Sequence, residues 1–114
     1  MSVCVKNAKI REAHKRTNLL LNAMPLTCHL WSKDFKLFYC NTASIKLFKA
    51  KTKKDFINSF FDYSPRYQSD GMLSTEKAKM LLTKAFNEGR CVSEWMHQLI
   101  DGTPLPTEIT LVRV

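Results

Sequence analysis

The sequence predicts an α+β domain in which an antiparallel sheet carries short helices on one face. Two observations lead to this class. Short apolar segments occur as two pairs separated by turn residues, and segments with helical periodicity lie between the pairs. Helices grouped between two hairpins favour an antiparallel sheet over a parallel sheet with crossover helices. The 114 residues, 45% of them hydrophobic, suffice for one domain with a core of its own.

An amphipathic helix is expected over residues 5–24, so we separate an N-terminal flanking segment, residues 1–24, from a domain at residues 25–114. Its apolar residues repeat at spacings of three and four: Ile10, Ala13, Thr17, Leu20 and Met24. Pro25 disfavours helix at the residue before it and marks the end. Two heptads are a weak coiled-coil signal. The helix therefore either lies on its own domain or forms a dimer and carries a signal.

The first hairpin is expected from two apolar runs, residues 26–31 and 37–40, with turn-forming residues between them. Asn41 or Thr42 then offers an N-cap for a short helix. Thr52 can cap a second short helix, whose apolar residues are Phe56, Ile57 and Phe60.

The clearest helix runs from residue 74 to residue 88. Ser74 or Thr75 can cap its first turn, and Gly89 stands where a left-handed residue ends many helices. Its apolar residues fall on one face: Ala78, Leu81, Leu82, Ala85 and Phe86. Two strands at residues 91–100 and 107–114 follow, joined through a turn with the sequence Asp-Gly-Thr-Pro.

Charge and cysteine content bear on possible partners. The formal net charge of +8 gathers before the first apolar run and within residues 46–54, where five lysines stand. Such a patch could hold nucleic acid, but a solvated face is favoured because the nearby Phe48 and Phe56 are typical core residues. The four cysteines contain no Cys-x-x-Cys pair and are expected to be reduced thiols.

The chain is expected to be a globular cytoplasmic domain. No apolar run approaches the roughly 20 residues that cross a bilayer. A lysine at position 6 leaves no room for the apolar part of a secretory signal. The apolar fraction is also too high for a disordered chain.

Several short motifs, taken in order, resemble those of the PAS domain family over residues 18–114. They begin with a helix that ends at Met24-Pro25, a hairpin that ends in Asn41, and a short helix that closes on Phe48. Later in the chain come Phe-Asn-Glu-Gly at residues 86–89, Glu-Trp at residues 94–95 and Asp-Gly-Thr-Pro at residues 101–104.

Three positions depart from the pattern of the family. Ser32 stands where the family often has Asp before the hairpin turn. Phe35 stands where the family has Gly within the turn, and Lys49 where Gly commonly follows the Phe.

The family also ends with a further strand, which lies centrally between its first and its penultimate strand. Nothing after Val114 can supply that strand. We therefore expect that the chain is a segment of a longer protein, and that the gap is closed by rearrangement, by water or by another chain. A continuous five-stranded sheet within one chain would contradict this expectation.

The resemblance implies a sensory and signal-transduction module rather than an enzyme. Such a module would belong to a larger cytosolic protein, for instance a sensor histidine kinase or a cyclic-dinucleotide signalling enzyme. It would bind a small molecule or a partner, form a homodimer and pass a change to a downstream domain in the same polypeptide. The residues agree, because the sequence has no phosphate-binding glycine loop, no zinc-protease motif and no nucleophile elbow.

The cofactor is left open, although haem and flavin are disfavoured. Flavin-binding light sensors of the family carry a reactive Cys in an Asn-Cys-Arg type motif, which neither Cys40 nor Cys91 reproduces. Haem-binding members place a His on the late helix, and residues 74–88 contain none. His29 and His97 stand on predicted strands, where a satisfied or solvent-edge imidazole is the ordinary case, so no metal site is expected.

The predicted site is a cup between the sheet and the helices. Three helix residues and four sheet residues are candidates for its ligand-binding wall: Phe60, Met80 and Leu81 with Trp31, Tyr39, Trp95 and His97. These side chains either bind a small ligand or simply fill the core.

Three other functions are open on the residues alone. The first is a dimerisation module with a filled core. The second is a small basic nucleic-acid-binding domain that uses Lys46 to Lys54, which the charge argument disfavours. The third is a cone-shaped α+β enzyme, which lacks a credible acid/base residue unless His97 serves as its base. Glu94 and Glu108 could lie opposite each other across the last hairpin, where each is expected to face solvent or to pair with a lysine.

Overall fold

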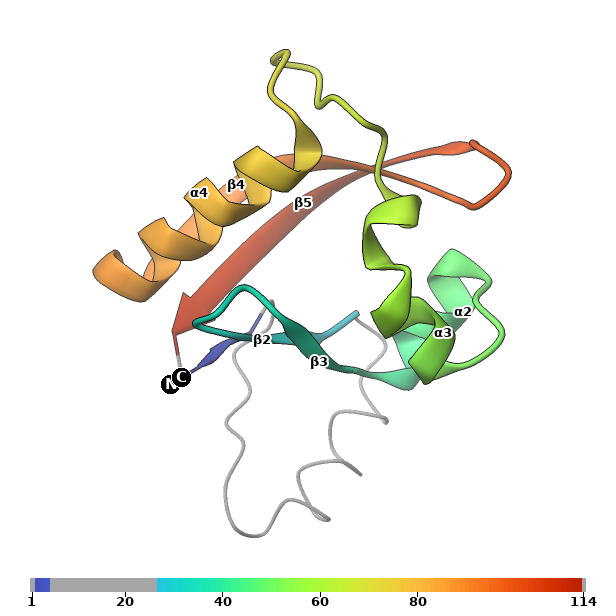
Figure 1. Ribbon diagram of the computed structural model, residues 1–114, viewed down its shortest axis with the longest axis horizontal. Coiled ribbons are helices and arrows are strands. Elements are labelled where there is room, and N and C mark those ends of the chain that lie inside the picture. The colour runs from blue at the N-terminus through green and yellow to red at the C-terminus, as the bar shows by residue number, and fades with distance from the viewer. Residues whose placement is uncertain (1, 5–26, 114) are drawn as a thin grey trace, which may run out of the picture.

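The computed structural model describes residues 2–4 and 27–113, which form an α+β fold as predicted (Figure 1). The strands are β1 (Ser2–Cys4), β2 (His29–Ser32), β3 (Leu37–Cys40), β4 (Arg90–Gln98) and β5 (Pro104–Arg113). The helices are α2 (Thr42–Phe48), α3 (Lys53–Asn58), the 3-10 helix η1 (Phe60–Tyr63) and α4 (Ser74–Glu88). The helix expected over residues 5–24 lies outside the described residues.

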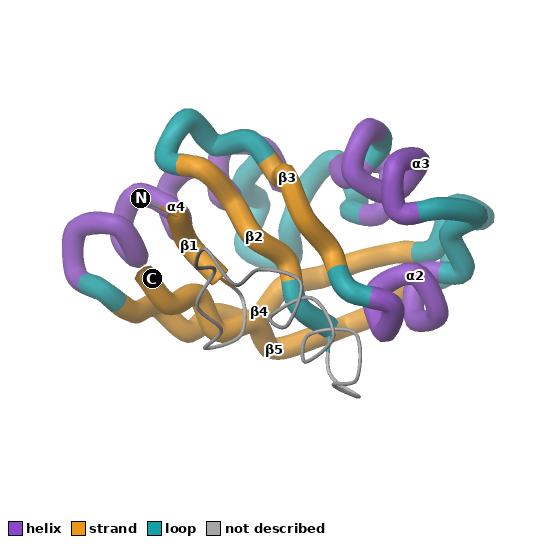
Figure 2. Tube along the Cα trace, turned by 90° about the horizontal axis from the view of Figure 1, so that it is seen from below, coloured by secondary structure: helices purple, strands orange, loops and turns teal. Residues whose placement is uncertain are grey.

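The strands join into one five-stranded sheet of order β3-β2-β1-β5-β4 (Figure 2). Two antiparallel hairpins, β2–β3 and β4–β5, form its outer parts. The short strand β1 lies between them and pairs antiparallel with one strand of each. Val3 pairs with Trp31 and Arg113, and Cys4 pairs with Leu30 and Val112.

The central strand requires two corrections. Ser2–Cys4 form a strand, although their place in the chain predicts a helical flanking segment. The expectation of a gap in the sheet is also wrong, because a strand of the same chain fills the slot between the two hairpins. Three residues are too few for hydrophobic periodicity to detect, and their pairing depends on edges that exist only in the folded chain.

The ladder between β4 and β5 keeps one register along the whole of β4. The N–H of Arg113 donates to the carbonyl of Gly89 across this ladder, so residues of β5 with odd numbers turn their backbone toward β4. Pro104 and Pro106 have even numbers, and their missing N–H groups cost the ladder no hydrogen bond. They also leave this part of the outward edge of β5 poor in donors for further pairing.

The two short helices begin at caps that the sequence predicts. Asn41 Oδ1 accepts the N–H of Ser44 at 3.2 Å and that of Cys28 at 2.9 Å, so it joins the start of α2 to the residue before β2. Thr52 Oγ1 accepts the N–H of Asp55 at 3.0 Å and starts α3.

The long helix α4 occupies the predicted residues, and Gly89 ends it with a φ of 90°. The predicted cap is wrong, because Leu73 holds the N-cap position without a side-chain hydrogen bond. The hydroxyl of Ser74 instead donates to the carbonyl of Pro65, which belongs to the loop before the helix. Within residues 27–113, two residues other than glycine also have a positive φ: Phe35, at 64°, and Lys49, at 54°.

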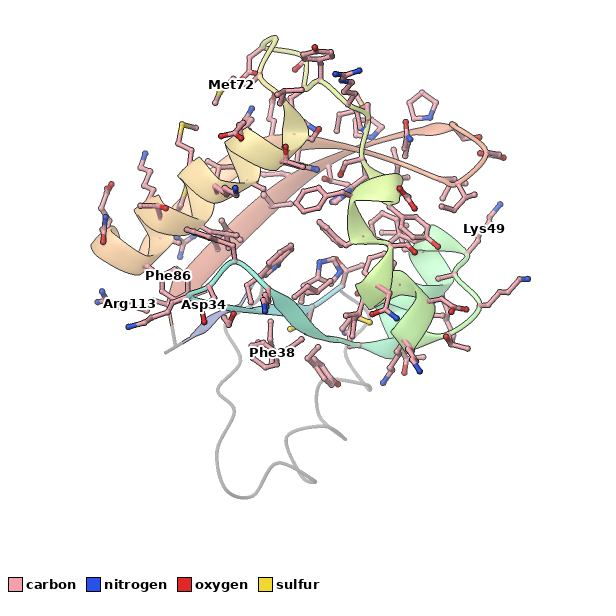
Figure 3. All side chains as sticks on the ribbon, in the orientation of Figure 1. Asp34, Phe38, Lys49, Met72, Phe86 and Arg113 are labelled. Carbon is pink, nitrogen blue, oxygen red and sulfur yellow. The ribbon has the colours of Figure 1, made fainter. Side chains whose placement is uncertain are left out.

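The core lies between the sheet and the helices, with α4 packed against β4 and β5 (Figure 1). Its buried cluster consists of Trp31, Cys40, Phe48, Phe56, Phe60, Tyr63, Leu81, Leu82, Ala85, Cys91, Trp95 and Leu111. Arg113 Nη1 donates to the carbonyl of Phe86 at 2.7 Å, which ties the last strand to the end of α4 (Figure 3).

Two smaller predictions can be compared with the structure. Cys28, Cys40 and Cys91 are buried, as expected of thiols that pack as small apolar side chains. Glu94 and Glu108 pair directly across β4 and β5, and both are exposed.

No helix in the described part of the chain is long and apolar enough to cross a membrane.

Candidate functional site

A cavity of about 300 Å³ lies between the sheet and the helices α2 and α4 and the 3-10 helix η1. Its aromatic and aliphatic wall includes Trp31, Phe48, Phe60, Leu81, Leu82, Trp95, Ile109 and Leu111. Its polar residues are Thr27, His29, His97, Thr107 and Glu108. The volume is at the lower end of the range that small-molecule sites occupy.

His97 presents a hydrogen-bond acceptor from the middle of β4. The residue is 5% exposed, and its Nδ1 lies 3.3 Å from the carbonyl oxygen of Tyr63. A carbonyl oxygen can only accept, so Nδ1 carries the proton of the neutral ring and Nε2 is unprotonated. Burial lowers the pKa of His97 to about 4, although its hydrogen bond to Tyr63 acts in the opposite direction, and the ring is neutral at pH 7.

His29 is the second imidazole of the wall. It is 4% exposed, and its ring centroid lies 5.3 Å from that of Phe56 and 5.6 Å from that of Phe60. Its Nε2 is the one buried side-chain nitrogen or oxygen of the described residues that has no hydrogen-bond partner. Burial, and secondly the charge of His97, lower the pKa of His29 to about 3. The sequence predicts a satisfied or solvent-edge ring here, and His29 is neither.

The tryptophans contribute apolar surface. The ring of Trp31 packs edge-on against Phe60, with the centroids 5.0 Å apart. Trp95 Nε1 donates to Ser64 Oγ at 3.0 Å, so the donor of this indole is occupied. Thr107 Oγ1 donates to the carbonyl of Trp95 at 2.8 Å. Both of these donors of the wall are therefore occupied by acceptors of the protein itself.

The loop before α4 is anchored to the edge of the sheet beside the cavity. Gln68 is 4% exposed, and its Oε1 accepts the N–H of Met96 at 2.8 Å. Its Nε2 donates to the carbonyl of Met96 at 3.1 Å and to Ser74 Oγ at 2.8 Å. The amide of Gln68 thus pairs with β4 much as a neighbouring strand would, and it fixes the strand that carries His97.

Most of the residues predicted for the site line the cavity: Trp31, Phe60, Leu81, Trp95 and His97. Tyr39 and Met80 do not line it. Tyr39 lies on β3, with Lys53 Nζ 5.5 Å from the centre of its ring. Met80 is 47% exposed, because it stands one residue, or about 100° around α4, from the buried Leu81.

The candidate wall derived from the sequence lacks His29 and Phe48. The alternation of β2 is the signal that could have found His29, because it stands two residues from Trp31 and such residues share a face of a strand. Phe48, at the end of α2, packs against His97 with ring centroids 4.9 Å apart. Its place in the wall depends on how α2 folds back over the sheet, which local spacing does not reveal.

No group of three or more His, Cys, Asp or Glu side chains within the described residues is placed to hold a metal ion. Comparison of the chain with protein-family models gave no match, and comparisons with curated proteins and with solved structures gave none either. The function therefore has to be argued from the cavity and its residues.

Proposed function

We propose that this chain is a PAS-like sensory module of a larger cytosolic signalling protein, such as a sensor histidine kinase or a cyclic-dinucleotide signalling enzyme, and that it binds a small molecule in the cavity. The observation that carries the proposal is the cavity of about 300 Å³ between sheet and helices. A dimerisation module with a filled core needs no such space, so the cavity favours a ligand.

Two features of the backbone support the resemblance to PAS domains. The order of hairpin, short helices, long helix and hairpin follows the family. Phe35 and Lys49 have left-handed backbone at the two positions where the family has glycine, the residue that adopts this conformation most easily. The slot of the family's last strand is occupied here by β1, from the opposite end of the chain.

The relay would run through β1. This strand pairs with Leu30 on β2 and Val112 on β5, which are direct neighbours of the cavity residues His29 and Leu111. A ligand that favours one arrangement of these strands would also favour one position of β1. Residues 5–24, for which we predict a helix, follow β1 and would pass the change to a second copy and to a downstream domain.

Native mass spectrometry of the purified chain, at low collision energy, tests the proposal. We expect an added mass per chain that denaturation removes. Leu81→Trp, which fills the cavity, should abolish the added mass, whereas Met80→Trp, on the exposed side of the same helix, should keep it. Circular dichroism shows whether each variant is folded. A clean dimer of unmodified chains would instead favour the dimerisation module, and a bare monomer would contradict ligand binding.

A further inference from the structure

We propose that the ligand is a small neutral ring compound with one N–H or O–H donor, of the indole or phenol class, and that this donor binds Nε2 of His97. The inference rests on the proposed function, because it names the ligand class of the same cavity. Three properties of the wall define the class: its volume, its lack of buried charge and the direction of its hydrogen-bonding groups.

The volume sets the size of the ligand. The cavity of about 300 Å³ has roughly twice the volume of the apolar cavity of ~150 Å³ that takes benzene. One or two fused rings with few substituents therefore fit, whereas a haem or a flavin is far too large. Trp31, Phe60 and Trp95 present aromatic surface, on which a planar ring can stack or pack edge-on.

The charges of the wall favour a neutral ligand. Its two imidazoles are uncharged at pH 7, because burial lowers the pKa of both. Among the described residues of the wall, Glu108 is the remaining ionisable one, and it is exposed. An ionic ligand in the interior would be desolvated without a buried counterion, which is costly.

The hydrogen-bonding groups call for a donor on the ligand. The tautomer of His97 is fixed by Tyr63, so Nε2 is an acceptor, and no hydrogen bond from the described residues reaches it. Trp95 Nε1 already donates to Ser64. His29 adds a buried Nε2 without a partner. Buried polar groups are nearly always paired, so the unpaired Nε2 of His29 indicates a wall that another molecule completes.

A matched pair of probes, indole and 1-methylindole, tests the donor directly. The two have nearly the same shape, but only indole carries an N–H. Calorimetric titration of the full chain should show indole binding about tenfold more tightly, because 1-methylindole would bury the acceptor of His97 unpaired. The imidazole ¹⁵N resonances of His97 should show a proton on Nδ1 in the free chain and a shift of Nε2 with indole.

Two variants locate the effect. His97→Leu should remove the preference for indole, whereas His97→Gln, which keeps a carbonyl acceptor, should retain part of it. Met80→Leu, outside the cavity, should behave like the native chain. If His97→Leu does not fold, the probe pair and the ¹⁵N spectrum of the native chain decide, since neither needs a variant.

The outcomes separate this inference from the proposed function. Equal binding of indole and 1-methylindole, or a proton on Nε2 of free His97, would overturn the donor while the cavity stayed a ligand site. Failure of both probes, together with a different added mass in the native spectrum, would overturn the ligand class alone. Failure of both probes with no added mass at all would overturn both proposals.

Discussion

Lys49 carries backbone strain that a single substitution can remove. Its φ of 54° costs a residue with a side chain about 1–2 kcal/mol, and glycine avoids this cost but loses about 0.5–1 kcal/mol more conformational entropy on folding. The Lys49 side chain is exposed and points away from the fold (Figure 3). Lys49→Gly should therefore raise the free energy of unfolding by about 0.5–1 kcal/mol, as measured by urea denaturation.

Lys51→Gly is the matched control for this prediction. Lys51 is also exposed but does not have a positive φ, so glycine there should be neutral or destabilising. A gain in stability of equal size in both variants would contradict the role of strain at Lys49.

The role of a single residue could be predicted where its hydrogen-bond partner is close in sequence. Asn41 and Thr52 each cap a helix by accepting an N–H three residues later, a distance that sequence reasoning covers. Ser74 looks like the same kind of residue, yet its hydroxyl donates to Pro65, nine residues earlier. Which acceptor the Ser74 hydroxyl finds depends on the path of the loop, and the local spacing of residues does not determine that path.

Among the elements, β1 joins the two hairpins through only three residues. A substitution in this strand therefore tests how the centre of the sheet is held together. Val3 pairs with Trp31 on one side and with Arg113 on the other. Proline has no N–H to donate and is not tolerated in a central strand. Val3→Pro should lower the free energy of unfolding by about 1–3 kcal/mol, the cost of buried backbone groups without partners. Urea denaturation measures the loss, and hydrogen exchange should show weaker protection of Leu30 and Val112.

Ser2→Pro provides the control, since Ser2 begins the strand and pairs with Ser32 alone. The first residue of a strand tolerates proline, so its effect should be smaller. Unchanged stability and unchanged protection in Val3→Pro would show that β1 does not hold the centre of the sheet.

Periodicity predicted the longer elements correctly. It did not always predict which residues of a helix face the core. The sequence predicts α4 with the residues that the structure has, since it combines an apolar face with a terminal Gly89. Met80 nevertheless lies on the solvent side, although Leu81 beside it lines the cavity. A methionine next to a leucine in the sequence is about 100° away from it on the helix.

The cavity is formed by the whole molecule. Sequence reasoning could predict residues of its wall but not the empty volume between them. Alternation and helical spacing identify inward-facing residues such as Trp31, Leu81 and Trp95. Whether such side chains meet or leave a space depends on how far apart the helices and the sheet are held. The Gln68 amide, which pairs with the backbone of Met96, contributes to that separation from 28 positions away.

Burial of two neutral imidazoles makes the stability of the whole molecule dependent on pH. In the unfolded chain a histidine has a pKa near 6.5, whereas the folded chain lowers the pKa of His29 to about 3 and that of His97 to about 4. Below pH 6.5 the unfolded chain therefore binds protons at these histidines that the folded chain does not bind. The contribution of the two neutral rings to the free energy of unfolding is fully present above pH 6.5 and is lost as the pH falls through 4 toward 3.

Between pH 7 and pH 5 each of these histidines should lower the free energy of unfolding by about 2 kcal/mol. Urea denaturation at the two pH values measures the sum. His97→Gln removes one titrating ring and should reduce the loss by about half. Asp70→Asn should leave it unchanged, because the pKa of Asp70 is lowered below 3.8, chiefly by its hydrogen bond from Met72, and its effect falls at more acidic pH. Equal stability at pH 7 and pH 5 would mean that His29 and His97 are accessible to protons in the folded chain, which would contradict the burial of the two neutral rings.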